Sequence, residues 1–244
     1  MNKIAIIIPS RLAAERLPNK PLKLINNKEM ILHVYDTAIK AQIGEVYVAT
    51  PDQAIYELLK KHGGKAIKTQ KNYQTGTDRI FEVFEKELKK KTDLIVNLQG
   101  DMPNLNPSGI INLVKHMEKK TCDIGTLASK FEEKKEEKNP NIVKVVVEKK
   151  IKAQEFASAL DFFRSSKDPI SNSTYHHIGI YAFTNKALIR YVGLKRSKLE
   201  IKRKLEQLRA LDNKMKIEVG YLDSLPLSVD TEEDLIKVKK NMEN

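Results

Sequence analysis

The hydrophobic residues of this chain fall into short apolar runs that alternate with segments of helical periodicity. Residues 4–8 form an unbroken apolar run that stops at Pro9, a pattern typical of a buried parallel strand. Apolar positions at helical spacing follow over residues 30–41, and further strands are predicted at residues 45–49 and 65–69. Strands and helices that alternate at this interval predict an α/β fold with a doubly wound, mostly parallel, Rossmann-like sheet.

The pattern changes beyond about residue 120. Before that point the chain predicts a helix over residues 79–90, a buried strand at 94–98 and a helix that begins at Asn106 and Pro107. Beyond it, strand-like segments crowd together, and residues 158–174 are expected to be a loop. The later strands are predicted at 123–131, 141–147, 150–156, 175–183 and 216–222. The later helices are predicted at 185–192, 199–211 and 232–242, the last with a capping box of Thr231 and Asp234. The second half therefore predicts a β-rich insertion.

Composition places the chain among globular proteins. Its 244 residues are 41% hydrophobic and 31% charged, which excludes an intrinsically disordered protein. No apolar run approaches the roughly 18 residues that a membrane span requires, and the first apolar run is too short for a signal peptide. Cys122 is the only cysteine and cannot form an intramolecular disulfide, which fits a reducing compartment. We therefore expect a cytoplasmic protein without a membrane partner.

The formal net charge of +12 is compatible with a nucleic-acid-binding protein. Most of the excess, however, is lysine mixed with glutamate, as in residues 130–138, which is typical of a solvated face. The densest basic cluster, residues 195–204, alternates cations with leucine and fits the start of an amphipathic helix. Because an anionic small substrate explains part of the charge as well as DNA or RNA does, we expect no nucleic-acid partner.

Candidate chemistry gathers where two predicted parallel strands end. The loop after Pro9 carries Arg11, Arg16 and Lys20, and cations at the carboxyl end of a strand suit a polyphosphate. The loop lacks the glycines of a Walker motif, so side-chain cations have to hold the phosphates. If the strand at 94–98 is a neighbour of the first strand, the loop that follows it faces the same crevice.

Two carboxylates are candidates for Mg²⁺, the ion that accompanies a nucleoside triphosphate. Asp101 follows the strand at 94–98, and Asp230 stands between an extended segment and the last helix. Taken singly, Asp101 is as readily explained as a turn residue before Met102 and Pro103, and Asp230 as a helix-cap residue. Their combination with the cations of the opening loop favours a magnesium site.

Seven motifs follow one another in register from the first strand to the last helix. They are IIPSRLAAERLPNKPL at 7–22, TGTDR at 75–79, VNLQGDMP at 96–103, NPNIVKVV at 139–146, HIGIYAF at 177–183, LEQLR at 205–209 and VDTEEDL at 229–235. Together they closely resemble the 3-deoxy-manno-octulosonate cytidylyltransferases, also called CMP-Kdo synthetases. One motif alone is weak, since many sugar nucleotidyltransferases begin similarly, whereas seven in order are specific.

The resemblance implies a reaction, a cofactor and an assembly. Enzymes of this family join CTP to the eight-carbon acid sugar Kdo with Mg²⁺ and release pyrophosphate. They are homodimers, and their product feeds lipopolysaccharide assembly in Gram-negative bacteria. By this resemblance, residues 1–244 form a single nucleotidyltransferase domain. Its segment 1–120 binds the nucleotide, 121–215 binds the acceptor sugar and forms the dimer, and 216–244 returns to the main sheet with a metal aspartate.

The resemblance also implies a role for individual residues. The nucleotide is held by Pro9, Arg11, Arg16, Lys20, Thr75, Gly76, Arg79 and Gln99. The catalytic residues are Arg16, Lys20, Asp101 and Asp230, of which the two aspartates bind Mg²⁺. The acid sugar is bound by Arg164, His177, Tyr181, Glu206 and Gln207.

Several of these residues have a structural alternative. Gln99 can satisfy backbone groups at a strand end. His177 shares a strand face with Tyr181, so a histidine at the edge of the core is the alternative to a sugar ligand. Tyr181 can pack with its hydroxyl directed outward, and Glu206 can pair with Lys202 or Arg203 on its own helix.

The sequence departs from the family pattern at a few positions. Asn19 replaces a usual glycine, although asparagine tolerates left-handed dihedral angles. Ala14 replaces a serine, which removes a phosphate hydrogen bond, and Met102 replaces an acid beside Asp101. Because residues 163–169 also drift, the acceptor sugar is less well defined than the nucleotide. The prediction is therefore CTP-dependent activation of Kdo. The alternatives are a cytidylyltransferase for sialic acid or a Kdo amino analogue, and a basic nucleic-acid-binding protein.

Overall fold

The computed structural model describes residues 3–13, 16–70, 73, 75–89, 91–119, 121–165 and 170–243. Chain contacts divide it into two compact units, unit 1 of Met1–Ile111 with Pro226–Asn244 and unit 2 of Asn112–Leu225. Unit 1 is therefore completed by a segment that follows all of unit 2 in the sequence. The predicted division of a single domain at residues 120 and 215 stays a prediction. None of the described helices is both long and apolar enough to cross a lipid bilayer.

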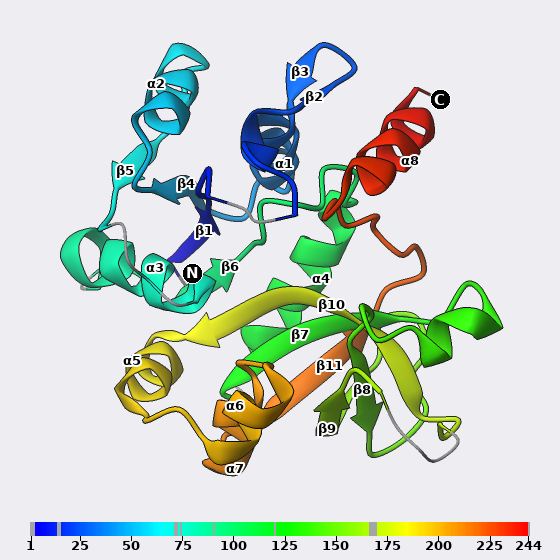
Figure 1. Ribbon diagram of the computed structural model, residues 1–244. Coiled ribbons are helices and arrows are strands. Elements are labelled where there is room, and N and C mark those ends of the chain that lie inside the picture. Colours follow the sequence, from blue (N-terminus) through cyan, green and yellow to red (C-terminus); the bar gives the residue numbers. More distant parts are fainter. Residues whose placement is uncertain are drawn as a thin grey trace. The chain divides into compact units, whose positions relative to one another are not determined.

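Unit 1 contains a parallel sheet with the strand order β5-β4-β1-β6 (Figure 1). In the centre, Ile6 of β1 lies opposite Val46 of β4 on one side and Val96 of β6 on the other. These strands are almost continuously buried, as expected for parallel strands covered on both faces. The strands are β1 (Ile4–Pro9), β4 (Glu45–Thr50), β5 (Ala66–Lys68) and β6 (Leu94–Asn97). The four predicted strands of the first half are confirmed.

The other elements of unit 1 connect or follow these strands. They are the hairpin β2 (Leu24–Ile25) and β3 (Lys28–Glu29), α1 (Met30–Lys40), α2 (Gln53–Lys61), α3 (Gly76–Val83), a π-helical turn (Phe84–Leu88) and α8 (Glu232–Met242). Helix α4 (Pro107–Met117) begins in unit 1 and ends in unit 2. The predicted capping box of Thr231 and Asp234 is confirmed. Helix α3 begins three residues before the predicted start, because the Thr75 hydroxyl accepts a hydrogen bond from the Asp78 amide at 3.1 Å and caps it.

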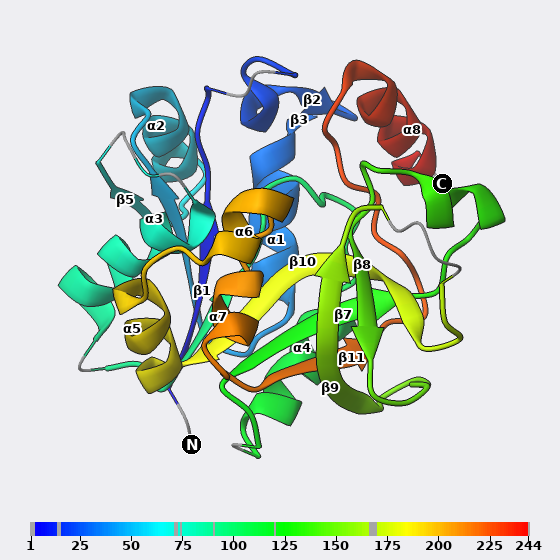
Figure 2. The same ribbon diagram turned by 60° about the horizontal axis from the view of Figure 1, so that its bottom comes forward.

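Unit 2 contains a mixed sheet with the strand order β10-β7-β11-β9-β8, in which β8 also pairs with β10. The five strands therefore form a closed ring of pairings, parallel only between β7 and β11 (Figure 2). The strands are β7 (Ile124–Ser129), β8 (Lys144–Val147), β9 (Phe156–Phe163), β10 (Thr174–Thr184) and β11 (Ile217–Tyr221). The helices are α5 (Asn185–Gly193), α6 (Lys198–Arg203) and α7 (Leu208–Asp212), with a 3-10 turn at Lys134–Lys138. The β-rich character predicted for the second half is confirmed.

Strand β9 lies where the sequence predicted a loop. Its buried residues alternate along the strand, but they include the small Ala157 and Ala159, so the hydrophobic pattern is faint. The strand predicted at 150–156 is wrong, because its residues before Phe156 contribute only an isolated bridge from Ala153 to Tyr221. Strands β8 and β9 form an antiparallel hairpin joined by residues 148–155.

The helix predicted over residues 199–211 is two helices. Lys204 adopts left-handed dihedral angles, with φ of 55° and ψ of 45°, and ends α6. The chain then turns and begins α7 at Leu208. A lysine in this conformation has no strong local signal in a sequence, because glycine and asparagine are the usual residues there.

Candidate active site

The opening loop is held in place by hydrophobic and polar contacts within unit 1. Leu17 belongs to a buried cluster with Val229 and with α8, and both views show α8 beside β2 (Figures 1 and 2). The Leu12 amide donates to Asp52 Oδ2 at 2.8 Å. Asp52 directly precedes α2, but its side chain makes no cap hydrogen bond there and accepts from the loop instead. Asn19 has φ of 55°, so the tolerance expected of asparagine is used here.

A cluster of opposite charges forms where this loop meets the segment before α8. The ammonium nitrogen of Lys20 lies 3.1 Å from Asp101 Oδ2 and 3.3 Å from Asp230 Oδ1, and it donates to the Val229 carbonyl at 2.8 Å. Arg16 Nη2 lies 3.0 Å from Asp230 Oδ2. Burial alone would lower the pKa of Lys20, but Asp101 and Asp230 raise it above its ordinary value. The four predicted catalytic residues are thus joined in one network.

The two aspartates fit a hard divalent cation. Asp101 and Asp230 share the ammonium of Lys20, so their carboxylates already converge on one positive charge. Their side chains are 26% and 41% exposed, which leaves both within reach of a ligand. Two carboxylates are the protein ligands that Mg²⁺ takes beside phosphate and water oxygens. The cap alternative for Asp230 is wrong, because Thr231 is the residue that caps α8.

A pocket of about 270 Å³ lies in unit 1 at the carboxyl ends of β1 and β6. Its walls include seven of the eight residues predicted to bind the nucleotide; the eighth, Arg16, lies on Asp230. Ser10 and Tyr73 also line the pocket, although nothing in the sequence singled them out. The seven are Pro9, Arg11, Lys20, Thr75, Gly76, Arg79 and Gln99. A position outside the carboxyl ends of parallel strands is the usual place for a ligand in such a sheet. Ala14 lies outside the described residues.

Arg79 is the most buried cation of the pocket, with 3% of its surface exposed. Its Nη1 donates to Thr69 Oγ1 at 2.6 Å and to the Gln70 carbonyl at 3.0 Å, and its guanidinium lies 5.5 Å from the ring centre of Tyr73. Burial and the charge of Arg11 lower its pKa. Arg79 therefore holds the segment after β5 against α3 while its charge remains at the pocket wall.

The first turn of α3 approaches β1 closely. A Cβ atom added at Gly76 would lie 3.2 Å from Pro9 Cγ and 3.6 Å from Gln99 Nε2. Gln99 is fixed in turn, because its amide donates to Asn97 Oδ1 at 3.3 Å. That contact is with a side chain rather than with the backbone groups of the structural alternative.

We expect Gly76→Val to obstruct the pocket and to raise the KM for the nucleotide about tenfold, because a branched side chain cannot fit beside Pro9 without displacing it. Steady-state kinetics with varied nucleotide measures this. Gly193→Val is the control, since a Cβ at Gly193 meets no atom within 4 Å. Equal KM values for the two variants would contradict the proposed close approach.

The residues predicted to bind the acid sugar lie in unit 2, and His177 is one of those that are buried. It is 7% exposed, its Nε2 lies 2.9 Å from Thr126 Oγ1, and its ring packs edge-on against Phe162. Burial lowers the pKa of His177 to about 3, so the imidazole is neutral at physiological pH. These contacts support the alternative of a packed histidine at least as well as that of a sugar ligand.

Tyr181 lies beside His177, and Glu206 lies close enough to Tyr181 to affect its pKa. The ring centres of His177 and Tyr181 are 5.5 Å apart, and burial together with the Glu206 carboxylate raises the pKa of Tyr181 well above its ordinary value. Tyr181 is only 6% exposed, so the outward alternative is wrong. Of the two cations offered as partners of Glu206, Arg203 pairs with Asp161 at 2.6 Å.

The remaining two sugar-side residues are Gln207, which directly follows Glu206 in the chain, and Arg164. Gln207 is buried and precedes α7. Arg164 follows β9, and its Nη1 donates to the Asn141 carbonyl at 2.9 Å. The structure therefore brings His177, Tyr181 and Glu206 together and places Arg164 on the turn of residues 139–142.

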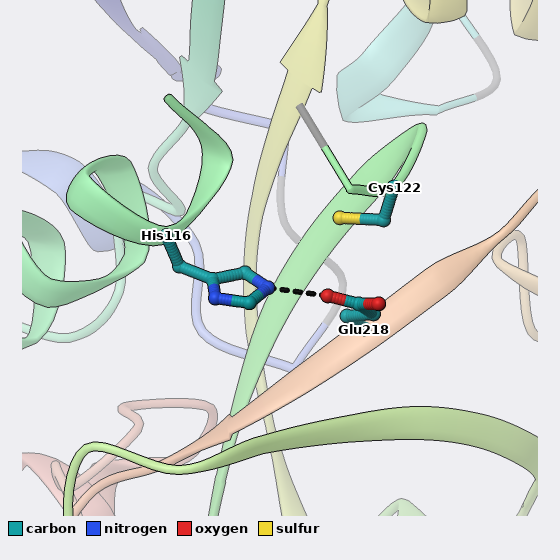
Figure 3. A group of neighbouring side chains, drawn as sticks. All are labelled: His116, Cys122 and Glu218. Atoms are coloured by element: carbon teal, nitrogen blue, oxygen red, sulfur yellow. Dashed lines mark hydrogen bonds and ion pairs between the residues drawn. The ribbon is translucent and has the colours of Figure 1, made fainter. Parts of the chain in front are cut away.

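A second polar cluster in unit 2 consists of His116, Cys122 and Glu218, whose donor atoms all lie within 4.8 Å of one another (Figure 3). Its donor types would suit a transition metal. However, Glu218 already accepts from His116 and Thr121 and pairs with Lys216 at 2.7 Å, while burial and Glu218 raise the pKa of Cys122 to about 12. The cluster is therefore better explained as a hydrogen-bonded contact that joins the end of α4 to β11.

Comparison with known proteins agrees with this geometry. The chain matches the cytidylyltransferase family model over residues 5–217. The 3-deoxy-manno-octulosonate cytidylyltransferases of Bartonella tribocorum and Bartonella bacilliformis are both 40% identical to it, over 96% and 98% of each chain respectively. A solved structure of CMP:2-keto-3-deoxy-manno-octonic acid synthetase complexed with CTP superposes with a TM-score of 0.89 at 36% identity, covering 99% of this chain and 98% of that one. From these similarities, this chain belongs to the 3-deoxy-manno-octulosonate cytidylyltransferase family.

Proposed function

We propose that this protein transfers the cytidylyl group of CTP to Kdo and releases pyrophosphate, as a step toward lipopolysaccharide. The observation that carries the proposal is the network of Lys20, Asp101 and Asp230 beside the strand-end pocket. Its cations suit a triphosphate, and its carboxylates suit the accompanying metal. The family to which the chain belongs indicates CTP as the nucleotide and Kdo as the acceptor sugar.

The chain's own contribution to this reaction is position and charge. The anomeric hydroxyl of Kdo has to attack the α-phosphorus in line with the departing pyrophosphate, which favours fixed cations around the phosphates. Arg11 and Lys20 line the pocket, and Arg16 reaches the same carboxylate as Lys20. These three cations would bind the triphosphate and neutralise the leaving group. Mg²⁺ held by Asp101 and Asp230 would add positive charge at the phosphate oxygens and lower the pKa of the hydroxyl.

Three finer points belong to the same proposal. The parallel order β5-β4-β1-β6 supports the description of unit 1 as a doubly wound, Rossmann-like sheet. The single, buried Cys122 supports a reducing cytoplasm. A homodimer is expected from the family resemblance, and light scattering during gel filtration would measure it.

The decisive experiment supplies the purified protein with CTP, Mg²⁺ and Kdo and measures pyrophosphate release. We expect release that depends on all three, far above that of an Asp101→Asn control. A parallel panel replaces Kdo by sialic acid or a Kdo amino analogue, and CTP by the other nucleoside triphosphates. Release no faster than in the control would reject the proposal, and a preference for another sugar would transfer it to that acceptor.

The structure weakens the alternative of a nucleic-acid-binding protein. Within the basic cluster of residues 195–204, Arg196 pairs with Glu200 at 3.0 Å and Arg203 pairs with Asp161. These guanidinium groups are engaged with carboxylates instead of being presented together to phosphates. We expect a duplex DNA titration to show no tight binding with a steep salt dependence; such binding would restore the alternative.

A further inference from the structure

The motif of residues 139–146 carries a buried lysine at the start of β8. Lys144 is 0% exposed. Its ammonium donates to three backbone carbonyl groups, those of Asn139, Ile142 at 3.0 Å and Arg164 at 2.7 Å. An ammonium group has three protons, so every donor of Lys144 has an acceptor. A buried charge is costly unless it is satisfied in this way.

These three carbonyls come from two segments that are distant in sequence. Asn139 and Ile142 belong to a turn in which Asn139 Oδ1 accepts from the Asn141 amide at 2.9 Å. Arg164 follows β9, and its guanidinium donates back to the Asn141 carbonyl at 2.9 Å. Arg164 is therefore fastened to the turn twice, through its main chain by Lys144 and through its side chain by Asn141.

The same segment also holds the strand that carries His177. The His177 amide donates to the Val143 carbonyl at 2.9 Å, and Lys144 lies opposite His176 in the pairing of β8 with β10. Lys144 also lies opposite Phe163, the last residue of β9. Lys144 is thus placed where the start of β8 and the end of β9 meet the first residues of β10, the strand that carries His177.

We propose that Lys144 is a positioning residue for the acceptor sugar, which acts by fixing the main chain of Arg164 on the turn of residues 139–142. The inference rests on the proposed function, because that function assigns Arg164 to an anionic sugar. A guanidinium recognises a carboxylate by the direction of its N–H groups as well as by its charge. Recognition of the sugar carboxylate by Arg164 therefore depends on a fixed backbone. Without the ammonium, three carbonyl groups lose their shared donor and the end of β9 is released from the turn.

The test is Lys144→Met, which keeps an unbranched side chain and removes the ammonium. We expect the KM for Kdo to rise about tenfold and the KM for CTP to change less than twofold. Leu188→Ala is the control: it removes a fully buried side chain of α5 in the same unit and should lower the melting temperature without changing the KM for Kdo. A loss of melting temperature in Lys144→Met with an unchanged KM for Kdo would overturn the proposal.

A double-mutant cycle with Arg164→Ala separates positioning from a direct effect. In the Arg164→Ala background, Lys144→Met should leave the KM for Kdo within twofold, because the group that it positions is gone. An independent tenfold rise in that background would contradict the proposal. If Lys144→Met does not fold, Asn139→Ala replaces it. That variant changes an exposed side chain of the same turn and should raise the KM for Kdo in the same direction.

Hydrogen exchange distinguishes a failure of this inference from a failure of the proposed function. If the wild-type protein does not use Kdo, the proposed function is rejected. The effect of Lys144 on Arg164 and its turn is then tested only by the exchange rates of backbone amides. Lys144→Met should then accelerate exchange at Ile142 and His177, whose amides bond to Asn139 and Val143 carbonyls. Exchange at these amides equal to that of wild type would overturn the role of Lys144.

Discussion

Asp101→Asn is expected to lower kcat for cytidylyl transfer about 10³-fold while the protein stays folded. Asparagine keeps the size of the side chain and an oxygen that can accept from Lys20, so the change removes mainly a negative charge. In the proposed function that charge holds Mg²⁺ together with Asp230, and it also raises the pKa of Lys20. Pyrophosphate release at saturating CTP and Kdo measures the loss of kcat. In a magnesium titration, the variant should need a higher Mg²⁺ concentration than wild type for half-maximal activity.

The matched control is Asp36→Asn. Asp36 pairs with Lys28 and is 29% exposed, against 26% for Asp101, so the two substitutions alter carboxylates of similar surroundings. Asp36 also pairs with His62 and is absent from the walls of the strand-end pocket. Its variant should retain kcat within about twofold. If Asp101→Asn keeps kcat within the same range, Asp101 does not hold the metal.

Arg209→Met is expected to destabilise the protein by about 3–5 kcal/mol, the usual cost of removing one partner of a buried ion pair. Arg209 Nε donates to Glu200 Oε2 at 2.9 Å and Arg209 Nη2 to Oε1 at 2.8 Å, while the two side chains are only 4% and 1% exposed. Methionine fills part of the space but leaves a buried carboxylate without this partner. Urea denaturation of both proteins measures the difference in the free energy of unfolding.

Arg196→Met is the control for this prediction. Arg196 pairs with the same carboxylate but is 43% exposed, and such pairs usually contribute less than about 1 kcal/mol. Equal decreases in the free energy of unfolding for the two variants would show that the burial of Arg209 does not strengthen its ion pair with Glu200.

The buried pair also predicts a dependence on pH. Burial opposes the charged form of Glu200, but its hydrogen bonds from Arg209 and Arg196 lower its pKa below the ordinary value of 4.5. A carboxyl with a lowered pKa stabilises the fold above pH 4.5, and this contribution is lost as the pH falls through the folded-state value. The gap in unfolding free energy between wild type and Arg209→Met should therefore narrow in acid. A constant gap down to pH 3 would contradict this origin.

The fold could be predicted wherever local sequence and tertiary environment agree. Residues 4–8 read as a parallel strand because both faces of β1 are buried, and Thr231 with Asp234 read as a helix start because a capping box is a local device. Strand β9 could not be predicted, because Ala157 and Ala159 are buried by packing on neighbours rather than by marked hydrophobicity. The break at Lys204 has the same cause, since tertiary packing imposes a conformation that the residue does not favour.

The candidate site was predictable to the extent that it lies at strand ends. Lys20 and Asp101 follow β1 and β6, and parallel neighbours bring such loops together. The supporting contacts were not predictable from pattern. Asp52 accepts a hydrogen bond from the Leu12 amide, and Lys144 donates one to the Arg164 carbonyl. In neither case are the two residues close in sequence. Long-range polar contacts of this kind leave no periodic trace.

The position of Asp230 sets the order in which the active site can be assembled during synthesis. Lys20 is translated 210 residues before the aspartate that binds it, and the cluster that orients its loop also waits for Val229 and Leu235. A nascent chain that already contains the strands of unit 1 therefore still lacks the second carboxylate of the proposed metal site. Catalytic competence should be acquired only after all of unit 2 has left the ribosome, so an incomplete chain cannot consume CTP.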